Sequence, residues 1–223
     1  VALSIGRDRA HLDASAGSVE SERAGVQFYG RADVGRLVVA GSMGTERIDS
    51  HTSRTILAGG AANQVDSDRK DTAWTVRLEA AMPAKTVTPY LGVGALRHKQ
   101  GDYSEIGADG LGLTASGDHH TVTFVDAGIR FDQSFCRCDI GGQLGVRHVL
   151  AGEDAGYTAA FTGAQDAYFN ISGQTLPTNT QRIGGRFQCS MTPSLNLFGD
   201  TGMDWSDGER RNLGGAIGIR IAF

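Results

Sequence analysis

Apolar and polar residues alternate along most of this chain with a period of two, the pattern of β-strands that bury only one face. Near residue 23 a segment begins in which Val26 and Phe28 share one face, while Gln27 and Tyr29 share the other. Ten segments follow this rule, at 1–11, 23–34, 36–47, 71–83, 86–98, 119–132, 137–150, 180–192, 194–205 and 212–223. The alternation predicts an all-β, antiparallel fold.

The polar face of these segments is rich in arginine and acidic residues, interleaved with glycine. Exposed sheets of soluble proteins favour Lys, Thr and Glu, whereas the lumen of a closed barrel favours planar Arg paired with acids, and Gly where space is tight. We therefore predict a transmembrane β-barrel with an apolar outer face. The residues expected to line its lumen are Arg31, Arg77, Glu79, Arg130, Asp139, Arg147, Arg182, Arg186 and Arg220. A soluble secreted β-sandwich that serves as a binding module shows similar alternation and remains an alternative.

Short and long connections alternate between the predicted strands. The short ones lie at Gly35, 84–85, 133–136 and Pro193. The long ones lie at 12–22, 48–70, 99–118 and 151–179, and the connection at 206–211 is of intermediate length. This arrangement is typical of outer-membrane barrels, whose turns face the periplasm and whose loops lie outside the cell. The carboxy-terminus is then expected in the periplasm.

Composition excludes several other classes of protein. Glycine makes up 32 of the 223 residues without a collagen period or excess proline, so the chain should fold. The net charge of -4 and the pI of about 5.8 provide no basic stripe for nucleic acid. Mean hydropathy is -0.21, and no apolar stretch approaches the length of a transmembrane helix. A β-barrel escapes that hydropathy test, because its strands alternate.

Candidate catalytic and metal-binding residues are few. His119 and His120 are adjacent, so on a strand they point to opposite faces, and no second ligand lies at the usual spacing. Asp102, Glu105, Asp118 and His119 could imitate the water-activating site of an omptin protease, but acids at loop starts are usually solvated. Nucleophile-elbow, P-loop and dinucleotide motifs are absent. We expect no catalysis, no metal and no cofactor.

Several different motifs follow one another in a set order over residues 70–223. They are Val87–Gly92 leading to Tyr103–Glu105, then Leu144–His148, Tyr157–Ala164, Phe169–Gly173, Ile183–Gly185 and a last strand that ends on Phe223. In this order the chain resembles the C-terminal translocator domain of autotransporters, the proteins that export their own N-terminal passenger (type V secretion). The resemblance extends more loosely to residue 1.

The resemblance implies a 12-stranded outer-membrane barrel that is threaded by a linker helix, anchors the passenger and exports it to the cell surface. Residues 1–223 would form one translocator domain holding strands 3 to 12, while the helix, the first two strands and the passenger would precede Val1. The barrel would then have exposed edges at its first and last strands. The implied partners are the passenger, the linker helix, the barrel-assembly machinery and lipid, with the barrel a monomer. A complete ten-stranded barrel, as in omptin proteases, is the alternative.

The last strand is expected to act as an assembly signal. Ile217, Ile219 and Ile221 alternate before a terminal aromatic residue, Phe223, as in outer-membrane proteins generally. Aromatic side chains near the predicted membrane boundaries are expected to form interfacial girdles. These are Phe131, Phe135, Trp205 and Phe223.

The three cysteines all fall at the short-turn end of neighbouring strands. Cys136 and Cys138 begin the seventh segment and Cys189 ends the eighth. Strand parity puts them on the apolar face, and the periplasm is oxidising. We therefore hypothesise a disulfide between Cys189 and one of the other two, with Cys138 as the nominated partner. The Cα atoms of Cys138 and Cys189 should then lie within about 7 Å of each other. The simpler explanation of the three cysteines is that they are small apolar side chains facing lipid, with no bond between them.

Overall fold

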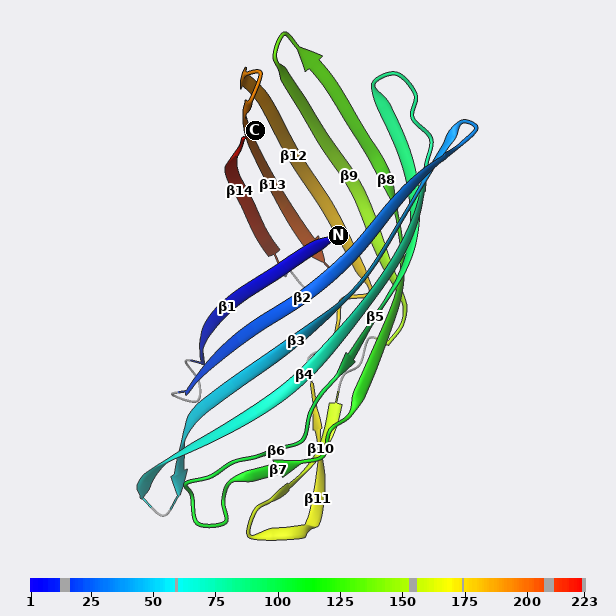
Figure 1. The fold of residues 1–223 in the computed structure, drawn as a ribbon. Helices are drawn as coiled ribbons and strands as arrows, with labels where there is room; N and C mark the ends of the chain where they lie inside the picture. The colour runs from blue at the N-terminus through cyan, green and yellow to red at the C-terminus, as the bar shows by residue number, and fades with distance from the viewer. Residues whose placement is uncertain (13–16, 59, 153–155, 174, 207–210, 222–223) are drawn as a thin grey trace.

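Antiparallel strands make up most of the fold in the computed structural model, which describes residues 1–12, 17–58, 60–152, 156–173, 175–206 and 211–221. Ten of the strands form one sheet in the order of the chain (Figure 1). They are β1 (Ala2–Leu12), β2 (Gly17–Val34), β3 (Leu37–Ala58), β4 (Ala61–Ala81), β5 (Val87–Lys99), β8 (His119–Phe135), β9 (Cys138–Ala151), β12 (Asn179–Thr192), β13 (Leu195–Ser206) and β14 (Arg211–Ile221). The predicted all-β antiparallel fold is confirmed.

The ten-stranded sheet is strongly curved and has two open edges, formed by β1 and β14. Figure 1 shows the two edge strands on the same side of the molecule, with β5, β8 and β9 opposite them. Among the described residues, β1 pairs only with β2 and β14 only with β13. Within the same residues, no helix is long and apolar enough to span a membrane.

The two faces of the sheet invert the usual arrangement of a protein in water. Leu78 and Val76 on β4 are 53% and 54% exposed, whereas their neighbour Glu79 is 6% exposed. On β8, Asp126 is 7% exposed while Ile129 on the other face is 40% exposed. Apolar side chains therefore cover the outside of the curve, and charged side chains lie in its concave interior. Such a surface is compatible with lipid rather than with water.

Four short turns gather at one end of the sheet, which is the upper end in Figure 1. They join β2 to β3, β4 to β5, β8 to β9 and β12 to β13. In the first of them Gly35 has a φ of 63°, a left-handed conformation that glycine adopts without steric penalty. Short turns therefore lie at one end of the sheet and long connections at the other, as the sequence predicts.

Two predicted loops are wrong, because the structure continues strands through them. The sequence predicts loops at 12–22 and 48–70, but β2 begins at Gly17, and β3 and β4 stay paired as far as Ala58 and Ala61. Beyond the apolar band both faces of these strands are polar, so the alternation is lost while the pairing persists. Cross-strand pairs such as Arg7 with Glu20 at 2.9 Å and His51 with Asp68 at 2.8 Å stabilise these extensions.

The other two long connections contain a second sheet, which was also not predicted. Its order is β11-β10-β7-β6, from strands β6 (Tyr103–Ser104), β7 (Leu113–Ala115), β10 (Gly156–Phe161) and β11 (Ala164–Ser172). Figure 1 shows it at the long-loop end. Backbone hydrogen bonds between Asp66 and Ile106, at 2.9 and 3.0 Å, attach it to β4. Two of these strands, β6 and β7, have only two and three residues and are too short for a periodic signal.

The outward face of the sheet generates a prediction about charge. Leu144 and Ile217 are 44% and 74% exposed on that face, and an Arg near mid-membrane costs roughly 2–4 kcal/mol there. Leu144→Arg and Ile217→Arg should therefore reduce the amount of folded barrel, measured as the heat-modifiable band in isolated outer membranes. Arg220→Gln on the concave face is the control and should leave the band unchanged. Equal behaviour of the two groups would contradict the assignment of faces.

Candidate lumen wall

A cluster of four charged side chains lies near the middle of the concave face. Both terminal nitrogens of the Arg130 guanidinium donate to the Glu79 carboxylate, at 2.5 and 2.6 Å. Arg77 lies 2.7 Å from the same carboxylate and also pairs with Asp126. Two cations and two anions therefore balance on β4 and β8. The bidentate geometry is the strongest form of such a pair.

A glycine on the strand between them allows two of these charges to meet. Arg77 lies on β4 and Asp126 on β8, and β5 runs between those strands. Gly92 of β5 lies directly beneath the pair, where an added Cβ would stand 3.0 Å from Asp126 Oδ1 and 3.1 Å from Arg77 Nη2. Such contacts are tighter than ordinary van der Waals contact, so with any larger residue at position 92 the ion pair would have to shift by a few tenths of an ångström. Glycine therefore leaves the room in which the two charges meet.

The same arrangement recurs two strands further on. Arg186 of β12 donates to Asp132 of β8 at 2.6 Å, reaching over the intervening strand β9. Gly141 lies in the gap, where an added Cβ would stand 2.5 Å from Asp132 Oδ1 and 2.8 Å from Arg186 Nε. By contrast, Arg182 and Asp204 are direct register partners on β12 and β13 and form two bonds of 2.7 Å.

The remaining predicted lumen residues have weaker or different partners. Arg147 lies over the Phe124 ring at 4.0 Å, and within the described residues its buried Nε has no hydrogen-bond partner. Arg220 lies over the Phe198 ring at 5.5 Å. Near the short turns, Arg31 pairs with Asp33 at 3.2 Å, where both side chains are exposed, and Asp139 accepts a hydrogen bond from Ser134 at 2.6 Å.

All nine residues thus belong to the concave face, and six of them have an ionic partner among the described residues or lie within the central cluster. The sequence analysis missed the partners Asp132, Tyr90, Phe124 and Phe198. Tyr90 lies beneath Arg130, whose guanidinium carbon is 4.1 Å from the ring centre. The sequence could have indicated these partners, since all four occupy positions on the polar face of strands whose side chains alternate. An aromatic residue at such a position indicates a cation partner.

The concave face retains space between its charged groups. A hollow of about 530 Å³ is lined by Arg130, Arg182, Arg186 and Asp204, with glycines of β12, β13 and β14 completing its floor. Because glycine adds no side chain, the wall is recessed there. The arrangement can accommodate another polypeptide segment with polar side chains.

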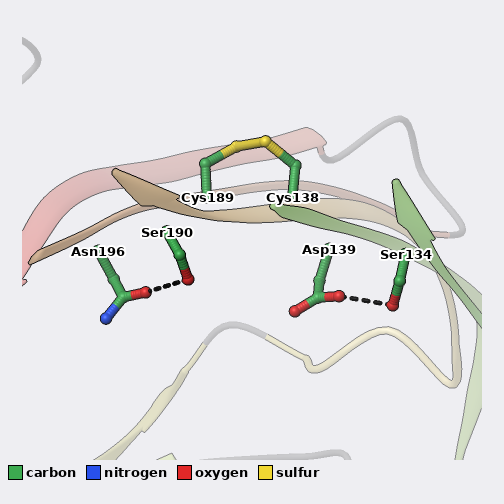
Figure 2. The surroundings of a disulfide bond; sticks show 6 residues. All are labelled: Ser134, Cys138, Asp139, Cys189, Ser190 and Asn196. Atoms are coloured by element: carbon green, nitrogen blue, oxygen red, sulfur yellow. Dashed lines mark hydrogen bonds between the residues drawn. A yellow bond between two sulfur atoms is a disulfide. The ribbon is translucent and has the colours of Figure 1, made fainter. Parts of the chain in front are cut away.

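A disulfide bond joins the two strands that flank the longest connection. Cys138 at the start of β9 and Cys189 near the end of β12 are bonded, with their Cα atoms 4.0 Å apart (Figure 2). This is the nominated pair, and its separation lies inside the 7 Å expected. Cys136 is exposed and has a free thiol. Figure 2 also shows the Ser134–Asp139 and Ser190–Asn196 hydrogen bonds on the opposite face of the strands.

Of the residues predicted to form aromatic girdles, Phe131 and Phe135 lie on the apolar face, 45% and 57% exposed. Trp205 donates a hydrogen bond of 2.7 Å to Gln181 on the neighbouring strand. The assembly-signal residues Ile217, Ile219 and Ile221 share the outward face of β14. Phe223 lies outside the described residues.

The outer residues that might have imitated a protease site have structural partners instead. Glu105 receives two bonds of 2.7 Å from Arg54 and another from the backbone of Leu113. Hydrogen bonding to this carboxylate raises the pKa of Arg54. Asp102 accepts from the Gly117 backbone, and His119 lies 3.9 Å from Asp118. Burial also raises the pKa of the neighbouring Tyr103.

The comparisons with known proteins decide what this wall belongs to. A family model described as the autotransporter β-domain matches residues 1–202. The chain belongs to this family. Autotransporter β-domains are outer-membrane β-barrels, and they are the translocator units for the export of a passenger. A search of the curated proteins finds no sequence match.

A solved structure of a translocator domain shares this fold. The translocator domain of the autotransporter NalP from Neisseria meningitidis is similar with a TM-score of 0.78 and 15% identity, over 99% of this chain and 72% of that one. The transport unit of the autotransporter AIDA-I from Escherichia coli matches with a TM-score of 0.40 and 11% identity, over 99% of this chain and 81% of that one. The family assignment rests on the family model.

The central ion pairs of the β-domain should contribute to its stability. Glu79→Gln replaces one of the two oxygens that accept from Arg130 with an amide donor and leaves two half-buried cations facing one anion, which should lower the free energy of unfolding by about 1–3 kcal/mol. Asp33→Asn is the matched control, because its pair with Arg31 is exposed and such pairs contribute about 0–1 kcal/mol. Urea unfolding in detergent measures both, and equal midpoints would contradict the role of the cluster.

The disulfide should stabilise the β-domain through the loop it closes. Its sequence separation of 51 residues corresponds to about 4 kcal/mol of lost chain entropy in the unfolded state. Cys189→Ser should therefore lower the guanidinium midpoint of the oxidised protein. Cys136→Ser, which removes the free thiol only, should not change the midpoint. A midpoint unchanged in Cys189→Ser would refute the expectation.

Proposed function

We propose that residues 1–223 act as one translocator domain, whose concave face forms the lumen through which the passenger is exported and in which the linker helix is held. The observation that carries this proposal is the inverted burial, with Glu79 and Asp126 enclosed and Leu78 exposed. The nine polar-face residues predicted from the sequence would line that lumen. Their hydrogen-bonding capacity would replace water for a passing polypeptide.

The lumen has a physical rationale in its balanced charges. Because Arg77, Arg130 and Arg182 are each paired with an acid of the wall, an extended segment meets dipoles and neutral pairs rather than a field of one sign. Such a wall would place no large net charge in the path of the segment. The β-domain would perform no bond chemistry and need no cofactor, and it would act as a monomer in the lipid bilayer.

The orientation is proposed from the two ends of the sheet. Short turns would face the periplasm together with the carboxy-terminus, and the second sheet would lie outside the cell, as in other outer-membrane barrels. The edges of β1 and β14 would be completed by the first two strands of the family's 12-stranded barrel. The family match favours this function over both alternatives, an omptin-like protein of ten strands and a soluble β-sandwich.

Two open glycine positions allow a direct test of passage through the lumen. Gly214 lies on the concave face of β14 and Gly30 on the outward face of β2, and an added Cβ at either would have no neighbour within 4 Å. Gly214→Trp should therefore fold but obstruct the lumen, whereas Gly30→Trp should only add an aromatic to the lipid side. Both are made in the full-length autotransporter.

Passenger export is measured by protease shaving of intact cells, and insertion by the heat-modifiable band. We expect equal insertion of both variants and a loss of surface passenger in Gly214→Trp alone, of the order of tenfold, because an indole occupies space that a glycine leaves empty. Equal export by the two variants would contradict the proposal that the passenger passes through the lumen.

The last strand is proposed to be recognised by the barrel-assembly machinery. Ile217, Ile219 and Ile221 would present an apolar face on an edge strand, and Phe223 would end it. Deleting Phe223 from the full-length protein should reduce the amount of inserted barrel in pulse-labelled cells. Deleting the side chain of Asn212 at the other end of the strand, by Asn212→Ala, is the control. Equal insertion with and without Phe223 would defeat this part of the proposal.

A further inference from the structure

The turn between β8 and β9 carries a free thiol next to the disulfide, and the function described above uses neither. Cys136 is exposed at the first position of this two-residue turn, and Cys138 follows directly after it. Cys136 has a φ of 52°, a region that favours glycine, so the turn holds a cysteine where its own geometry does not call for one. The bonded sulfurs, by contrast, belong to half-buried residues.

Covalent geometry places Cys138 within reach of both other cysteines. Two residues of chain span at most about 7 Å, which is the upper limit of Cα separation for a disulfide between Cys136 and Cys138. On the other side, the Cα atoms of Cys138 and Cys189 are 4.0 Å apart. The Ser190 backbone donates to the Arg137 carbonyl at 2.7 Å, which holds the end of β12 beside the turn. The three cysteines therefore form one connected group.

We infer that this group is a thiol–disulfide exchange site, at which Cys136 receives a disulfide from a periplasmic thiol oxidase and passes it to Cys138 and Cys189. The inference rests on the proposed orientation, which puts the short turns in the oxidising periplasm. An oxidase must bring its own disulfide onto the attacking sulfur, so the exposed thiol on a tight turn is the accessible entry point. The half-buried pair is its destination.

The exchange proceeds in three displacements that balance. The Cys136 thiolate attacks the oxidase disulfide, which forms a mixed disulfide and releases one oxidase thiolate. The Cys138 thiolate then attacks the Cys136 sulfur, which forms the Cys136–Cys138 bond and releases the oxidase as a dithiol. Finally the Cys189 thiolate attacks the Cys138 sulfur and releases Cys136. Two thiols of the chain are oxidised, the oxidase disulfide is reduced, and the thiol protons pass to the oxidase.

The rate of disulfide formation tests the entry role. Full-length wild type, Cys136→Ser and Lys85→Ser are expressed in cells, reduced briefly, and followed by acid quenching and thiol alkylation after the reductant is removed. Lys85 is the matched control, because it has a φ of 46° in the turn between β4 and β5 at the same end of the sheet. We expect Cys136→Ser to form the Cys138–Cys189 bond at least about fivefold more slowly, to the same final extent.

Equal rates in all three proteins would overturn the inference. The heat-modifiable band is measured in the same samples, so a failure of insertion, which would count against the proposed function, is seen separately from a failure of exchange.

The Cys136–Cys138 intermediate can be trapped and identified. In Cys189→Ser the last displacement is impossible, so the intermediate bond should accumulate. Trypsin cleaves after Arg137, between the two cysteines, and would leave peptides 131–137 and 138–147 joined only by that bond. Mass spectrometry of the alkylated digest should find the linked pair, and reduction should separate it. Recovery of both peptides with free, alkylated thiols would overturn the proposed route.

Discussion

The structure depends on one constraint, which is that the outer face of the sheet has lipid as its solvent. A bilayer offers no hydrogen-bond partners, so every backbone group of a spanning segment must be bonded between strands, and every outward side chain must be apolar. Val76 and Leu78 on β4 obey the second requirement, and Arg77 and Glu79 between them are forced to the interior. The charge clusters are thus a consequence of the lipid face. A long polar side chain that cannot face lipid has to find its partner across the concave wall.

Glycine determines which charges can meet across that wall. Arg77 reaches Asp126 over Gly92, and Arg186 reaches Asp132 over Gly141. Other glycines lie directly opposite an aromatic ring, which covers the backbone that they leave bare. Such pairs in the strand register are Gly94 with Phe124, Gly142 with Phe131, Gly199 with Phe187 and Gly218 with Phe198. The high glycine content therefore has two structural causes, and neither is flexibility.

The sequence predicts those parts of the fold in which one face of a strand contacts lipid. Within the membrane the period of two identified all ten strands, their faces and the nominated pair Cys138 and Cys189, because lipid imposes that period. Outside the membrane, both faces of β3 and β4 contact water, so residues 48–70 show no alternation of apolar and polar side chains. The sequence therefore predicts a loop there. In the second sheet, β6 and β7 are too short to give a periodic signal. The alternation also cannot predict that Arg186 of β12 pairs with Asp132 of β8 across β9. It assigns each residue to a face of the sheet, but it does not give the register between strands that are not direct neighbours.

The disulfide lies where the topology makes register hardest to establish. β9 and β12 are neighbours in the sheet, yet the whole β10–β11 hairpin is inserted between them, and closing so long a loop is entropically unfavourable. Four other neighbouring pairs are joined at this end by tight turns that set their register locally, and the connection from β5 to β8 is shorter than the one from β9 to β12. A one-residue slip between β9 and β12 would turn Arg182 and Arg186 toward lipid. A covalent bond between directly opposed residues at the base of the two strands excludes that slip, and so protects the inward orientation of the charge pairs on which the rest of the wall is built.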